Sequence, residues 1–167
     1  MTINSIVGQL QRLKLTGMAE ALEQQAMLPG VQDLAFEDRL AMLLDREQEE
    51  RDNRSCTARL RRARLRLRAS VEEVSCKAGR GISHRTLMQL AEGHWIRAGA
   101  NLTIVGASGT GKTFLACALA HQACRQDHAV LYRRVPELFD EFAVARATGQ
   151  RQKLMRRLGR VALLVLD

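Results

Sequence analysis

The chain has 167 residues, 46% of them hydrophobic, and a formal net charge of +8. That length allows one ordinary domain, or a small domain with part of a second one, and no apolar run approaches the roughly 20 residues that a membrane span needs. The start of the chain also lacks the layout of a signal peptide. The positive charge suits a polyanionic partner, nucleic acid first and an anionic membrane second, although it also serves solubility alone.

Residues 1–68 are predicted to form an N-terminal helical domain for oligomerisation or for contact with DNA or a partner. Residues 3–28 have apolar positions at helical spacing, and Gly17 is the candidate break between two helices. A Pro-Gly turn follows at residues 29–30. Residues 36–67 then read as one long helix, because they contain neither proline nor glycine.

The charge along this predicted long helix changes sign. Residues 20–52 are rich in acids, whereas residues 53–68 contain arginines and no acid. A guanidinium can donate two hydrogen bonds to a phosphate, and on a helix these arginines would occupy two neighbouring faces. We expect contacts to the DNA backbone without base specificity; the alternative is a solvated face that pairs with the acidic stretch of the same or a neighbouring chain. The candidate DNA contacts are Arg59, Arg61, Arg62, Arg64, Arg66 and Arg68.

Residues 69–98 are predicted to be a connector and a lead-in helix. Residues 77–81 read as its loosest part, and Ser83 is placed to cap a helix from about His84 to Gly93. Trp95 is most simply a packing anchor against the following domain, with a place in an adenine pocket as the alternative.

Residues 106–113 read G-A-S-G-T-G-K-T and fit the pattern G-x-x-x-x-G-K-[ST]. An apolar run at residues 102–105 predicts a strand before this loop, and a helix to about Arg125 is predicted after it. Glycines let backbone N–H groups turn toward phosphates, and a helix N-terminus adds its dipole. Lys112 can reach the β- and γ-phosphates, and the Thr113 hydroxyl can bind Mg²⁺.

A chance glycine turn is the alternative to this interpretation of the loop. The predicted cofactors are ATP and Mg²⁺. The predicted ATP-binding residues are Gly106, Ala107, Ser108, Gly109, Thr110, Gly111, Lys112, Thr113 and Phe114.

The rest of the chain predicts two more strands with helices between them. A strand is expected at residues 129–133, a helix at residues 137–147, and a further basic helix at residues 150–158. The positive side chains of this last helix are either a second candidate nucleic-acid contact or an ordinary surface face. The unbroken apolar run at residues 161–166 predicts a buried parallel strand. Asp167 directly after it reads as the Walker B acid, which together with Thr113 helps to hold Mg²⁺. Residues 99–167 are thus predicted to be a P-loop NTPase domain that ends at the Walker B acid, and the fold class is α/β.

Cysteine spacing predicts no further site. The four cysteines show no C-x-x-C pair, which favours a reducing, cytoplasmic compartment without a metal-cysteine site. Two of them lie seven positions apart after the loop and are expected on one buried helix face. The cysteines are Cys56, Cys76, Cys117 and Cys124.

Several blocks of the sequence, in addition to the two nucleotide motifs, resemble the IstB family of transposition helper ATPases. That family belongs to the AAA+ class and is related to the DnaC helicase loader. The similar blocks span nearly the whole chain, and they are residues 13–22, 36–40, 61–65, 94–97, 101–102 and 105–116.

The resemblance implies an ATP-binding helper protein for DNA transposition. Such proteins assemble into homo-oligomers on double-stranded DNA, with ATP between neighbouring subunits, and hand the target to a partner transposase. Lys112, Thr113 and Asp167 match family positions. The family pattern also has a second acid directly after Asp167, later sensor residues, an arginine finger, and a strand between the one at residues 102–105 and the one at residues 161–166. We therefore expect a C-terminally truncated form with weak or no hydrolysis and no complete catalytic set.

Three other functions stay open at this point. A DnaC-like helicase loader shares the same ATPase domain. A small-molecule kinase uses the same loop but rarely opens with an arginine-rich helix. A non-catalytic remnant that binds DNA or caps an oligomer would need no second acid.

Overall fold

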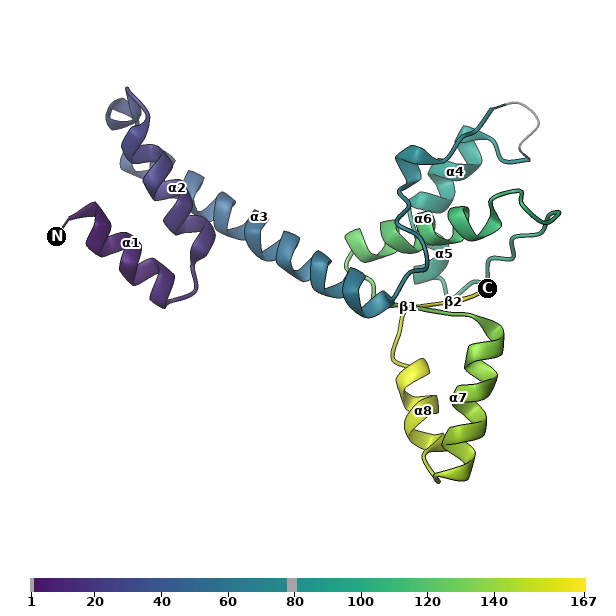
Figure 1. Cartoon of the computed structure of the whole chain (residues 1–167). Coiled ribbons are helices and arrows are strands. Elements are labelled where there is room, and N and C mark those ends of the chain that lie inside the picture. The colour runs from purple at the N-terminus through teal and green to yellow at the C-terminus, as the bar shows by residue number, and fades with distance from the viewer. Residues whose placement is uncertain (1, 78–80) are drawn as a thin grey trace. The chain divides into compact units, whose positions relative to one another are not determined.

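The computed structural model describes residues 2–77 and 81–167. It divides into two compact units, one up to Ser55 and one from Cys56 to Asp167, so that helix α3 (Phe36–Ala63) contributes to both (Figure 1). Positions 78–80 of the expected connector lie outside the described residues. Among the described residues, no helix is both long and apolar enough to cross a membrane.

The first unit is helical. Helices α1 (Ile3–Arg12) and α2 (Thr16–Met27), the short 3-10 helix η1 (Val31–Asp33) and the first part of α3 build it. The prediction that Gly17 breaks the first stretch was wrong. The break lies just before Thr16, where Lys14 has a left-handed φ of 62°, and Gly17 is the second residue of α2.

Gly17 is required by packing. A Cβ at this position would lie 2.6 Å from the carbonyl oxygen of Arg46 and 2.7 Å from the Cα of Glu47, both on α3. The buried Glu47 carboxylate accepts hydrogen bonds from the N–H groups of Gly17, at 2.9 Å, and Met18, at 3.3 Å. A carboxylate there satisfies free donors at the N-terminus of α2 and interacts favourably with the helix dipole.

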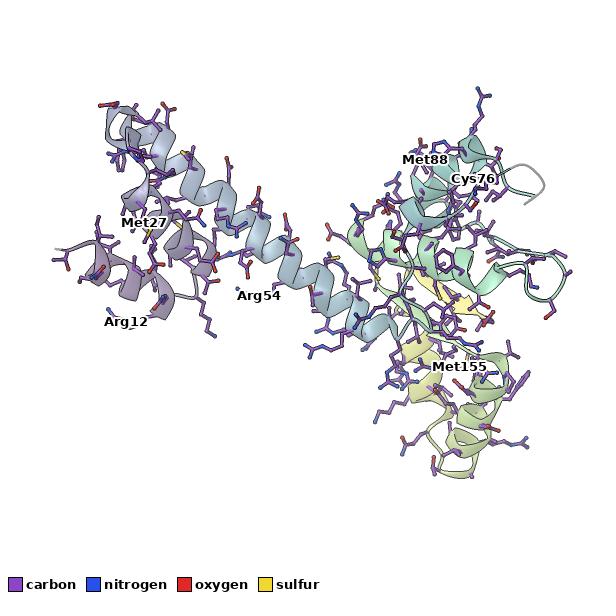
Figure 2. The ribbon with its side chains drawn as sticks, turned by 45° about the horizontal axis from the view of Figure 1, so that its top comes forward. Arg12, Met27, Arg54, Cys76, Met88 and Met155 are labelled. Atoms are coloured by element: carbon purple, nitrogen blue, oxygen red, sulfur yellow. The ribbon has the colours of Figure 1, made fainter. Side chains whose placement is uncertain are left out.

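Side chains of the first unit also tie α3 to α2. Arg54, labelled in Figure 2, donates hydrogen bonds to the Thr16 hydroxyl at 2.8 Å and to Glu50 at 3.2 Å. Gln25 donates to the carbonyl oxygen of Arg39 at 2.9 Å. These contacts fix the local register of the two helices.

Helix α3 ends at Ala63, four residues earlier than predicted. Arg64 adopts a left-handed φ of 54°, and the residues after it are not helical. Ala63 is fully buried among residues of α6 and β1. The expectation that the arginines of residues 59–68 share two helical faces was therefore wrong for those after Ala63.

The second unit surrounds α6 (Lys112–Arg125), which follows the predicted phosphate loop. Its inner residues are almost completely buried, and they include Cys117 and Cys124, as predicted. Burial raises the pKa of the Cys124 thiol to about 11. The short helices η2 (Val71–Glu73), α4 (His84–Ala91) and α5 (His94–Arg97) precede the loop.

The predicted cap of α4 is confirmed, because the Ser83 hydroxyl accepts a hydrogen bond from the N–H of Thr86 at 3.1 Å. The expected helix from His84 to Gly93 is shorter, however, because α4 ends at Ala91 and Gly93 caps the separate helix α5 in a left-handed conformation, with φ 72°. Helix α6 ends at Arg125, where the sequence predicted its end.

The sheet consists of β1 (Val130–Arg133) and β2 (Leu163–Leu166), which are parallel, with Val130 opposite Leu163 and Arg133 opposite Leu166. Helices α7 (Val135–Ala147) and α8 (Arg151–Leu158) connect the strands and lie side by side (Figure 1). This arrangement confirms the predicted α/β class with a partial parallel sheet and flanking helices.

The predicted strand at residues 102–105 was wrong, because this segment has no strand pairing. A groove of about 630 Å³ is lined on one side by residues 102–104 and on the other by β2. Strand structure requires a hydrogen-bonded neighbour, and the groove separates the two segments. For the same reason β2 is half-buried rather than buried, and Leu166 is 53% exposed.

Candidate nucleotide-binding site

The loop before α6 uses its glycines for backbone conformation. Gly109 and Gly111 have φ values of 77° and 89°, in the left-handed region that side chains disfavour. Gly111 is the residue that caps α6, so the free N–H groups of the first helical turn open onto the loop. Because these are the conformations that turn N–H groups inward, the loop backbone is suited to an anion.

The Lys112 side chain curls back over this loop. Its Nζ donates hydrogen bonds to the carbonyl oxygens of Gly106, at 2.9 Å, and Ala107, at 2.7 Å. The Thr110 hydroxyl also donates to Ala107, at 2.8 Å, and closes the turn. An ammonium group and a helix N-terminus therefore lie within one short turn, which is a donor set that fits a polyphosphate.

Asp167 lies opposite the start of α6. Its Oδ1 accepts a hydrogen bond from the Thr113 hydroxyl at 2.8 Å, and its Oδ2 accepts one from the Tyr132 hydroxyl at 2.6 Å. The Nη1 of Arg66 lies 3.5 Å from the same Oδ2. The hydrogen bonds from Tyr132 and Thr113 lower the pKa of the Asp167 carboxyl, while burial and the bond to Asp167 raise the pKa of Tyr132 to about 12.

Backbone hydrogen bonds fix the position of Asp167 at the end of β2. Its N–H donates to the carbonyl oxygen of Arg133 at 3.1 Å, and its carbonyl oxygen accepts from the N–H of Val135 at 2.9 Å. The acid is thereby held beside the end of β1. A hydroxyl and a carboxylate oxygen together are hard ligands of the kind that Mg²⁺ prefers, so the residues fit that ion.

Two aromatic residues considered as nucleotide contacts, Phe114 and Trp95, also make packing or hydrogen-bond contacts within the protein. Phe114 packs against the buried cluster of the second unit, which leaves its N–H in the first turn of α6. The indole N–H of Trp95 donates to the carbonyl oxygen of Leu90 at 2.9 Å, which supports a packing role. Trp95 also lines the groove of about 630 Å³, together with Lys112 and Asp167.

The six arginines predicted to contact DNA differ in their surroundings. Arg59 donates to the carbonyl oxygen of Cys124 at 2.8 Å and pairs with Asp127, and its side chain is only 16% exposed. Arg66 pairs with Asp167. The other four are exposed, two in the last turn of α3 and two after it; these are Arg61, Arg62, Arg64 and Arg68.

The basic helix α8 has one arginine in an internal network. Arg157 donates to Glu141 of α7 at 2.6 Å, and the buried Arg133 donates to the same carboxylate at 2.8 Å. The neighbouring Met155, labelled in Figure 2, is 53% exposed. This network connects α7, α8 and β1. Because the guanidinium of Arg157 is paired within the protein, the structure favours an ordinary surface helix over a nucleic-acid contact for this residue.

The sequence interpretation missed Tyr132. It predicted a strand there but assigned no role to the residue, although it is the only tyrosine of the chain and lies near the end of a strand. Among the described residues, no three side chains of His, Cys, Asp or Glu gather to form a metal site. The groups that meet at the end of β2 are therefore a single acid, Asp167, two hydroxyl groups and an arginine.

Comparison with known proteins relates the chain to ATP-binding proteins of insertion sequences. The family described as IstB-like ATP binding protein matches residues 8–167. A Sinorhizobium fredii protein named as an insertion sequence ATP-binding protein, y4pL, is 44% identical over all of this chain and 68% of its own length. The insertion sequence IS1162 ATP-binding protein of Pseudomonas fluorescens is 40% identical over all of this chain and 73% of its own length.

A second Sinorhizobium fredii protein of this kind, y4uH, is 42% identical over 95% of the chain and 64% of its own length. The matched region contains the phosphate loop and the acid at the end of β2, together with most of the N-terminal helices. The chain belongs to the IstB-like ATP-binding protein family.

Proposed function

We propose that the chain binds ATP with Mg²⁺ through residues 106–114 and Asp167, and that it serves as an ATP-binding helper of DNA transposition. Membership of an ATP-binding family, and relatives named for insertion sequences, support this proposal. The observation that carries it is the hydrogen bond of 2.8 Å between Thr113, which follows the loop lysine, and Asp167 at the strand end.

Each group at the site has a distinct role in this proposal. The N–H groups at the start of α6 and the Lys112 ammonium bind the phosphates. Thr113 and Asp167 hold the Mg²⁺, the acid usually through water. When bound, the ion neutralises phosphate charge. This assignment uses only groups that already lie next to one another.

Double-stranded DNA is the proposed target, bound through phosphates without base specificity. Arg61, Arg62, Arg64 and Arg68 are exposed and are the stronger candidates for these contacts. Arg59 is better explained by its contacts inside the second unit. A homo-oligomer, a partner transposase and a cytoplasmic location complete the proposal.

Hydrolysis is expected to be weak or absent in the 167 residues by themselves. Among the described residues, the side chains that contact Asp167 are two hydroxyls and an arginine, and none of them is a second acid that could polarise an attacking water. A steady-state ATPase assay with and without duplex DNA tests this expectation, and robust DNA-stimulated turnover would refute it.

Binding to DNA provides the test of the helper function. Fluorescence anisotropy of a labelled duplex should report tighter binding with ATP and Mg²⁺ than without nucleotide, and Lys112→Ala should remove that difference. Lys153→Ala, which changes an exposed lysine of α8, is the matched control. DNA binding that ignores nucleotide in the unsubstituted chain would instead favour a non-catalytic DNA-binding remnant.

A further inference from the structure

We propose that Tyr132 is a positioning residue. Its hydroxyl holds Oδ2 of Asp167, so that Oδ1 stays beside Thr113, and this orientation of the carboxylate strengthens Mg²⁺-dependent nucleotide binding. The proposal rests on the function proposed above, and it adds a residue of β1 to the site. Arg66 is assigned the smaller part of a counter-charge on the same oxygen.

The two oxygens of Asp167 have different partners. Oδ1 accepts from Thr113 at 2.8 Å, whereas Oδ2 accepts from Tyr132 at 2.6 Å. A carboxylate at the end of a strand can rotate about its side-chain bonds, and a short hydrogen bond to a charged acceptor is among the stronger ones. The bond from Tyr132 therefore selects the rotation in which Oδ1 faces the start of α6.

The hydroxyl of Tyr132 is itself held in place. The residue is only 5% exposed, and its ring packs in a buried cluster with Leu87 of α4 and Cys117 of α6. In the sheet it lies opposite Val165, two residues before the acid. Because the core fixes the ring, the donor is preorganised rather than recruited from a mobile side chain.

Arg66 is a weaker partner by the same measures. Its contact with Oδ2 is 3.5 Å long and its side chain is 51% exposed, so solvent screens the pair. A cation beside the acid also opposes a divalent ion by charge repulsion. Tyr132 and Arg66 therefore have opposite influences on the gain in ATP affinity that Mg²⁺ provides. Removing the tyrosine hydroxyl should reduce this gain, and removing the arginine should leave it equal or slightly larger.

Titration of the chain with ATP, once in Mg²⁺ and once in EDTA, tests the proposal. The ratio of the two affinities measures the contribution of the ion. Tyr132→Phe should reduce that ratio by about 3- to 10-fold, the range expected for one hydrogen bond, with little change of affinity in EDTA. Asp167→Asn should remove most of the ratio, and Arg66→Ala should keep it, with Arg85→Ala, at an exposed position of α4, as the matched control.

A second measurement covers the case in which the phenylalanine variant does not fold. The chain has one tyrosine, so 3-fluorotyrosine labelling gives a single ¹⁹F signal, from residue 132. That signal should shift when Mg²⁺ is added to the ATP-bound chain, and the shift should disappear in Asp167→Asn. An unchanged signal, or a Tyr132→Phe variant that keeps the unsubstituted ratio, would overturn the proposal.

These outcomes separate two failures. If the chain takes up no ATP and Lys112→Ala behaves identically, the nucleotide site itself is wrong, and the positioning role falls with it. If ATP binding depends on both Lys112 and Mg²⁺ but is indifferent to the Tyr132 hydroxyl, only the positioning role fails. A variant that merely lowers the melting temperature would show a structural role for Tyr132.

Discussion

Thr113 and Asp167 are 54 positions apart in the chain, yet the hydroxyl of one donates to the carboxylate of the other at 2.8 Å. The contact joins the first turn of α6 to the end of β2, and the proposed Mg²⁺ site requires these two residues to lie together. Other contacts hold these two elements in place, because α6 buries one face in the core and β2 pairs with β1. The site therefore follows from the packing of helix and sheet.

The loop conformation gives the first prediction. Gly111→Ala places a side chain at a φ of 89°, which should cost about 1–2 kcal/mol of stability and should also weaken ATP binding by distorting the loop. Gly149→Ala, at a φ of 69° in a turn outside the site, should cost similar stability without changing ATP affinity. Thermal unfolding and nucleotide titration of the two variants check this, and equal ATP affinities would contradict it.

The packing of α2 on α3 gives the second prediction. Gly17→Ala should destabilise the first unit by about 1–3 kcal/mol or more, because the new methyl group meets backbone atoms that cannot move aside. Gly8→Ala is the control, since a Cβ there has no neighbour within 4 Å and the position is inside α1. Alanine at Gly8 should stabilise the helix by up to about 1 kcal/mol. Urea unfolding of both variants should show opposite signs.

The buried acid of the first unit gives a prediction of pH dependence. Burial raises the pKa of Glu47, but the hydrogen bonds from Arg51, Met18 and Gly17 outweigh it and lower the pKa below the ordinary value of 4.5. A lowered pKa means that the stabilising contribution is present above the ordinary value and is lost as the pH falls through the folded-state value.

Glu47→Gln should therefore be less stable than the unsubstituted chain near neutral pH. The difference should shrink as the pH is lowered below 4.5. Urea unfolding of both proteins at a series of pH values measures it, and a difference that grows on acidification would show that the carboxylate is not stabilising.

The arginines give a prediction that separates structure from DNA contact. Arg61→Ala combined with Arg62→Ala should lower the slope of log affinity against log salt by about one per lost phosphate contact, with unchanged thermal stability. Arg59→Ala should instead lower stability, because it leaves the carbonyl oxygen of Cys124 and the carboxylate of Asp127 without this partner. Anisotropy titrations at several salt concentrations check this, and a salt slope that only Arg59→Ala changes would reverse the assignment.

Local patterns in the sequence predicted much of this fold. The glycine loop, the helix that follows it and the acid after an apolar run depend on short-range rules for turns, helix ends and strands. The cap at Ser83 is of the same kind. Each of these features is decided by residues that are close neighbours in the chain.

Most of the wrong predictions concern partners that are distant in the chain. Gly17 is a glycine because α3 approaches it, which no pattern within α2 indicates. Residues 102–105 have the composition of a strand but lack a paired neighbour, and the family resemblance itself places that neighbour in a strand that the 167 residues do not contain. Helix α3 ends at Ala63 without a local stop signal, since the burial of Ala63 in the second unit fixes the end. Tyr132 was missed because its contact to Asp167 spans 35 positions.

Isothermal titration calorimetry of ATP into the chain in the presence of Mg²⁺ measures the proposed nucleotide binding itself. We expect saturable binding of one ATP per chain, retained in Lys153→Ala. In Lys112→Ala the binding should be lost or weakened at least about tenfold, since a charged hydrogen bond to phosphate is worth about 1.5–3 kcal/mol. Heats that are absent from the unsubstituted chain, or identical in the Lys112→Ala variant, would contradict it.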